Sequence, residues 1–126
     1  KPQEANSKMR DTDFDYDDVY DIYDDVEKLL PDEARVVRFN PTMTELPDAC
    51  CRWLELLREV ILPPGLIKIG DQAFDGCENM TMIAVPTTTE QIGDGSFECC
   101  KQLPKDFIQN LPFGLKKIGE SAFAHC

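Results

Sequence analysis

A repeated segment constrains the fold of this chain more than any other feature. Residues 69–77 read Ile-Gly-Asp-Gln-Ala-Phe-Asp-Gly-Cys, and close copies occupy residues 92–100 and 118–126. The copies begin 23 and then 26 residues apart, and a weaker copy begins another 23 residues upstream, at Leu46. One unit of this length cannot bury its own apolar face, so recurrence at a period of about 20 to 50 residues predicts a stack of similar units. The stack should run from about residue 36 to residue 126.

Each unit also carries a short alternation of apolar residues, at 37–39, 60–62 and 83–85. A period of two is the pattern of a strand with one buried face, and the prolines that follow each run would end the strand. The central residue of each run should then point outward. We expect these outward residues to contact a partner protein: Arg38, Ile61 and Ala84. Three extra residues within 103–111 leave the register of the next strand open.

Two columns of identical residues should lie inside the stack. A phenylalanine recurs at one repeat position, as Phe74, Phe97 and Phe123, and should form a ladder that fills the interior. A cysteine recurs at another, as Cys77, Cys100 and Cys126, where a buried free thiol behaves as a small hydrophobe. Disulfides between stacked cysteines are the alternative in an oxidising compartment. Zinc is disfavoured because the other cysteines occur in the adjacent pairs Cys50-Cys51 and Cys99-Cys100. Neighbouring residues rarely bind one metal ion, and the chain has no Cys-x-x-Cys motif.

The repeat resembles the BspA-type leucine-rich repeat. The shared pattern is Leu-x-x-Ile-x-Ile-Pro followed, after five residues, by Ile-Gly-x-x-Ala-Phe-x-x-Cys, and it covers residues 36–126. The first copy departs from it, with Pro47 in place of glycine and Cys51 in place of phenylalanine. The resemblance implies an α/β leucine-rich-repeat solenoid of about four coils with short strands on one face. It also implies protein binding or adhesion, with no catalytic residues and no cofactor.

The N-terminal third differs in charge from the repeats. The chain carries a net charge of −11, of which −8 falls on residues 1–33. We therefore expect an acidic disordered tail at 1–17, and the apolar spacing from Val19 to Leu30 predicts a helix. This gives three segments: the tail, a capping helix with its linker at 18–35, and the repeats at 36–126, which stop within a repeat and should continue. The alternative for the helix is to dock a basic partner.

Three short motifs suggest chemistry, but two lack an essential part and the third has an equally simple structural explanation. His125 beside Cys126 has no apparent third residue to orient a Cys-His nucleophile. Residues 11–15 begin like a calcium loop, yet its glycine and final glutamate positions hold Tyr16 and Ile22. Asn79-Met80-Thr81 is a glycosylation sequon, although a turn residue explains Asn79 equally simply. We predict no catalytic residues and no metal site.

These observations predict a non-catalytic scaffold that binds a protein through its strands. The negative charge disfavours nucleic acid, and no apolar stretch is long enough for membrane insertion. A cell-surface or secreted adhesion module is one alternative, and a targeting or regulatory region of a larger protein with a catalytic domain is another. We expect a monomer or part of a longer array, and a cytoplasmic location, with the cell surface or secretion as the alternative.

Overall fold

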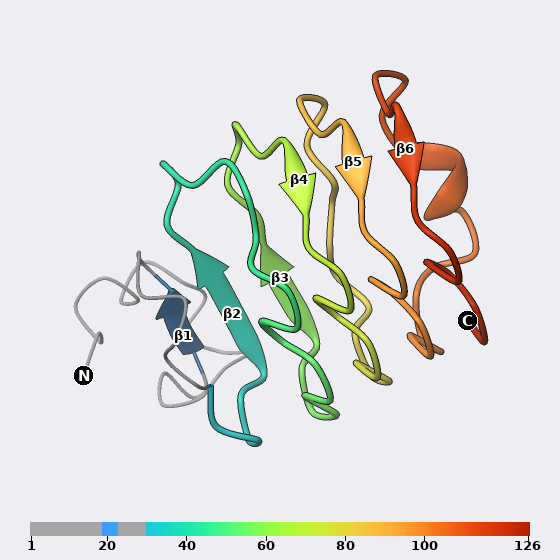
Figure 1. Cartoon of the computed structure of the whole chain (residues 1–126). Coiled ribbons are helices and arrows are strands. Elements are labelled where there is room, and N and C mark those ends of the chain that lie inside the picture. The colour runs from blue at the N-terminus through green and yellow to red at the C-terminus, as the bar shows by residue number, and fades with distance from the viewer. Residues whose placement is uncertain (1–18, 23–29) are drawn as a thin grey trace.

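The computed structural model describes residues 19–22 and 30–126, and in these residues the chain forms coils that stack side by side (Figure 1). The first sheet contains β1 (Val19–Ile22), β2 (Val36–Phe39) and β3 (Glu59–Ile61), in that order. The second contains β4 (Lys68–Ile69), β5 (Gln91–Ile92) and β6 (Lys117–Ile118). All pairings are parallel, because the chain completes a coil before it returns to the same sheet.

The strand register follows the repeat. In the first sheet Arg38 pairs with Ile61, and in the second Ile69 pairs with Ile92, which pairs with Ile118. The second sheet was not predicted, since the expected strands all lay on one face. Its strands are only two residues long, and a segment this short cannot display an apolar alternation.

The segment that follows each strand of the second sheet turns sharply. The N–H groups of Gln72, Phe74 and Gly76 donate to carbonyl oxygens of the next coil, each at 2.8 Å, while the intervening N–H groups donate three residues back within the turn. Positive φ angles of 57° at Gln72 and 78° at Gly76 interrupt any helical path. The described residues accordingly contain no α-helix, and the α component of the predicted α/β class is wrong for them.

The predicted capping helix is also wrong where it can be compared. Residues 19–22 form β1, which pairs along its full length with β2. A strand satisfies the backbone groups at the edge of β2, which a helix cannot do, and Val19, Tyr20 and Ile22 are good strand formers. Residues 23–29 of the predicted helix and the predicted tail at 1–17 lie outside the described residues.

The core lies between the two sheets. Phe74 and Phe97 stack with ring centroids 5.4 Å apart, and Phe97 and Phe123 stack at 5.5 Å with the rings almost parallel. Phe39 meets Phe74 edge to face at 6.5 Å. Other large side chains that are fully buried around this stack are Leu57, Leu66, Ile69, Met80 and Ile92.

The first sheet loses its regular pairing after β3. Only Met82 bridges to Glu59, so the strand predicted at 83–85 does not form. On the following coil the 3-10 helix η2 (Ile108–Asn110) lies where a strand was expected. The three extra residues of this repeat are accommodated by hydrogen bonds within residues 106–111, so the following coil offers residues 83–85 no strand to pair with.

Candidate protein-binding surface

The three residues predicted to face a partner lie on successive coils, Arg38 and Ile61 within the first sheet and Ala84 just after the bridge residue Met82. Arg38 in β2 is adjacent to Ile61 in β3 by register, and both are half-buried. Continuing the Glu59–Met82 bridge by two residues brings Ala84, which is exposed, beside Ile61. We call the outer side of β2, β3 and residues 82–85 the β-face.

A shallow groove of about 460 Å³ crosses the β-face between residues 59–62 and 81–84. Val60 is buried beneath it, Leu62 and Ile83 are half-buried, and Met82 is 48% exposed. Met82 was not among the predicted contact residues, although extending the alternation upstream from Ala84 by two residues would have placed it outward. The groove therefore offers apolar side chains on adjacent coils.

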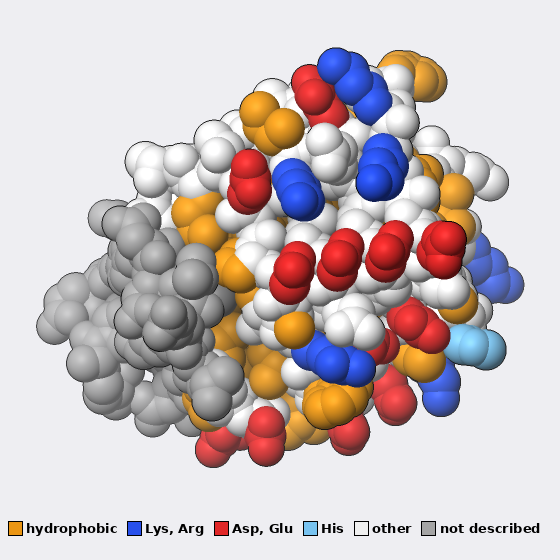
Figure 2. Space-filling model, in the orientation of Figure 1, with side chains coloured by type: hydrophobic (Ala, Val, Ile, Leu, Met, Phe, Trp, Pro, Cys, Tyr) orange, Lys and Arg blue, Asp and Glu red, His pale blue; other side chains and the backbone are white. Residues whose placement is uncertain are grey.

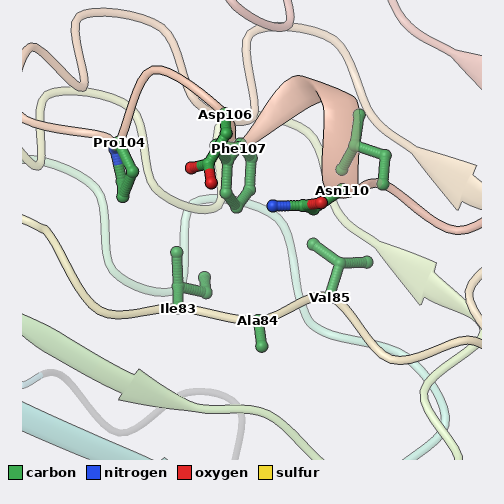
Figure 3. A pocket seen from close by; sticks show the side chains of 8 residues that line it. Ile83, Ala84, Val85, Pro104, Asp106, Phe107 and Asn110 are labelled. Atoms are coloured by element: carbon green, nitrogen blue, oxygen red, sulfur yellow. The ribbon is translucent and has the colours of Figure 1, made fainter.

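A second, smaller cavity opens where η2 replaces a strand (Figure 3). Its volume is about 180 Å³, and we call it the slot. Ile83 and Val85 project from one wall toward the opposite one, whereas Ala84 points the other way. The opposite wall consists of Pro104, Asp106, Phe107, Asn110 and Leu111. The slot and the groove share Ile83 and Ala84, so they adjoin.

A row of acidic side chains crosses the molecule beyond the ends of β4–β6 (Figure 2). The carboxylate of Asp48 accepts a hydrogen bond from the N–H of Asp71 at 2.8 Å. Asp71 and Asp94 repeat this contact with the N–H groups of Asp94 and Glu120, at 2.9 and 2.8 Å. These aspartates link consecutive coils, and the described residues contain no group of acidic, cysteine or histidine side chains arranged to hold a metal ion.

The predicted cysteine ladder residues donate to the preceding coils. The thiols of Cys77, Cys100 and Cys126 reach backbone carbonyl oxygens at 3.1, 3.0 and 3.1 Å. Cys77 and Cys100 are fully buried and Cys126 is exposed, and all six cysteines are free thiols. Burial raises the pKa of Cys77 to about 12 and raises the pKa of Cys100 further still. In this arrangement the buried thiols act as neutral hydrogen-bond donors.

The two buried thiols should therefore resist alkylation. A pKa raised from 9.0 to about 12 lowers the thiolate fraction of Cys77 at pH 8, by about a thousandfold, and the thiolate is the reactive form. We expect iodoacetamide at pH 8 to label exposed Cys126 in the folded protein, and Cys77 and Cys100 only after addition of urea. Peptide mass spectrometry measures this. Equal labelling rates for Cys77 with and without urea would contradict the burial.

The other sequence motifs occupy separate places. His125 is exposed, and the neighbouring Cys126 thiol is directed to the carbonyl oxygen of Phe97. The side-chain amide of Asn79 donates to the carbonyl oxygen of Glu55 at 2.7 Å, so it has a partner within the chain. Residues 11–15 lie outside the described residues.

Parallel strands repeated once per coil, with a glycine bend and a stack of phenylalanines behind them, define a leucine-rich-repeat protein. The family model described as BspA type Leucine rich repeat region (6 copies) matches residues 34–126. The chain belongs to this BspA-type family. The resemblance stated from the repeat pattern is thereby confirmed.

Two solved structures share the fold. A leucine-rich repeat protein from Bacteroides ovatus superimposes over 86% of this chain with a TM-score of 0.72 and 25% sequence identity. The leucine-rich repeat protein of T. pallidum superimposes over 79% with a TM-score of 0.57 and 23% identity. The matched region spans 28% of the first protein and 63% of the second. No curated protein matches the sequence.

None of the described helices has the length and apolar character required to cross a bilayer.

Proposed function

We propose that this chain is a non-catalytic scaffold that binds a protein through the β-face. The observation that carries the proposal is the groove between β3 and residues 81–84, where apolar side chains of adjacent coils remain partly exposed. Exposed apolar surface of this kind, rimmed by polar residues, is typical of protein interaction sites. Residues 36–126 form the binding unit in this proposal, as a solenoid whose coils present the surface.

The surroundings of the groove fit a partner of mixed character. Met82 and Ala84 offer exposed apolar contact area, and half-buried Arg38 lies on the neighbouring strand β2, paired with Ile61. Interfaces of this type combine an apolar centre with a polar rim, and arginine and methionine are enriched in them. The thiols with raised pKa values and the aspartates of the acidic row form hydrogen bonds between coils, so they support a structural role rather than a catalytic one.

Introducing charge into the groove should abolish partner binding. The double substitution Ile61→Glu and Ala84→Glu places two carboxylates where an apolar partner surface would exclude water, and we expect affinity to fall by about 10- to 100-fold or more. The immobilised chain first captures a partner from an extract of the source organism. The purified partner is then titrated against both proteins by calorimetry.

Ile67→Glu is the matched control, because Ile67 is 40% exposed but precedes β4 in the other sheet. It should retain the wild-type affinity. Circular dichroism would verify that the double variant is folded. Undiminished binding by the folded double variant would refute the proposed surface.

A further inference from the structure

We propose that the slot binds an extended peptide segment of the partner, with one apolar side chain inserted and a lysine or arginine beside it. This inference rests on the proposed function and specifies the chemistry of the partner. Three features of the slot support it: its unpaired backbone, its size and apolar lining, and the carboxylate at its mouth.

The backbone of the slot is available for pairing. No hydrogen bond joins Ile83, Ala84 or Val85 to another described residue. By contrast, the same coil is bonded just upstream, where the N–H of Met82 donates to the carbonyl oxygen of Arg58 at 3.0 Å. An extended segment with free N–H and C=O groups can pair with a peptide in the manner of an added strand.

The size of the slot suits one side chain. Its volume of about 180 Å³ lies below the roughly 300 Å³ at which pockets for small molecules begin. Its lining is largely apolar: Ile83 and Val85 project toward the wall that holds Phe107 (Figure 3), and Leu111 also lines the slot. Phe107 is held in place by its ring contact with Phe97 at 5.3 Å. A branched or aromatic side chain would therefore find a preformed apolar site.

The charge at the slot favours a basic neighbour for that side chain. Asp106 lies beside Phe107 at the slot, is exposed, and forms no ion pair with another described residue. Asn110, on the same wall, adds a polar amide but no charge. Opposite charges across an interface contribute mainly to specificity, so Asp106 should select lysine or arginine next to the apolar side chain. The net charge of −11 acts in the same direction.

Selection from a phage-displayed library of random heptapeptides tests the inference. On the full chain we expect enrichment of sequences in which an apolar residue adjoins a lysine or arginine. Selection on Asp106→Lys should instead enrich an adjoining glutamate or aspartate. A synthetic peptide from the wild-type selection should bind Asp106→Lys and Asn110→Trp, which fills the slot, about tenfold more weakly or worse. Glu120→Lys is the matched charge reversal, because Glu120 is exposed at the end of the acidic row, and it should leave affinity unchanged.

The outcomes separate this inference from the proposed function. Enriched peptides that tolerate Asp106→Lys and Asn110→Trp but lose affinity with Ile61→Glu would overturn the slot and leave the β-face as the binding surface. Peptides insensitive to all of these substitutions would overturn both. Selection with no enrichment over an uncoated surface would overturn the slot, whereas the β-face would still be judged by titration of the captured partner. Circular dichroism should first verify that each variant is folded.

Discussion

Replacing Phe97 with alanine is expected to lower the free energy of unfolding by about 3–5 kcal/mol. Phe97 is fully buried, and its ring contacts three other rings: Phe74 at 5.4 Å, Phe123 at 5.5 Å and Phe107 at 5.3 Å. Truncation would remove the apolar transfer energy of the ring and leave a cavity between two coils. The stack cannot close this cavity easily, because backbone hydrogen bonds join the coils on both sides of it.

Urea unfolding measures this effect through the fluorescence of Trp53, the only tryptophan in the chain. Phe113→Ala is the matched control, since Phe113 is fully exposed and its loss should change stability by less than about 0.5 kcal/mol. Circular dichroism should give the same midpoint as fluorescence if the stack unfolds as one unit. Similar midpoints for Phe97→Ala and Phe113→Ala would show that the phenylalanine stack does not hold the coils together.

Replacing Gly93 with alanine is expected to cost about 1–3 kcal/mol or more, as overpacking does. A Cβ atom built on Gly93 lies 2.7 Å from the backbone nitrogen of Asp71 and 2.8 Å from the carbonyl carbon of Gly70. Both neighbours are backbone atoms of the preceding coil, so neither can rotate away. The substitution would push the coils apart and weaken the bond from the Asp94 N–H to the Asp71 carboxylate.

Gly65→Ala is the control for this prediction. A Cβ atom on Gly65 meets nothing within 4 Å, and the residue needs no left-handed backbone. Alanine there should be neutral or stabilising by about 0.4–1 kcal/mol, through the entropy of the unfolded chain. The urea unfolding midpoints of both variants, compared with that of the wild type, measure these changes in stability. Equal midpoints for Gly93→Ala and wild type would mean that the coils are not packed as closely as the structure has them.

The repeat spacing carried most of the successful expectations. The offsets of 23 and 26 residues reappear as the strand registers of β4, β5 and β6, and the family follows from the same pattern. Phe74, Phe97 and Phe123, which the pattern put in one column, form a stack in the structure. The outward positions Ile61 and Ala84 border the groove, and their role in binding stays a prediction.

Other features depend on contacts that no local pattern reports. The apolar spacing of residues 19–22 fits a helix, but the open edge of β2 pairs with them as a strand. The second sheet was not predicted because its strands are two residues long and form only where stacked coils pair with one another. The α/β class implied by the family resemblance predicted helices. The N–H groups of Gln72 and Phe74 instead donate to carbonyl oxygens of the next coil, so they are not available for the hydrogen bonds of a helix.

The sequence by itself determined that this protein stacks its repeats, because residues of one kind recur at a spacing that only adjacent coils can bury together. Tertiary structure alone decided where the stacking is imperfect. Three extra residues could be accommodated in several ways, and the coils around them select η2, which opens the slot beside residues 83–85. The physical reason is that a backbone hydrogen bond between coils needs a donor from one segment and an acceptor from another, so the sequence of one segment does not determine the pairing.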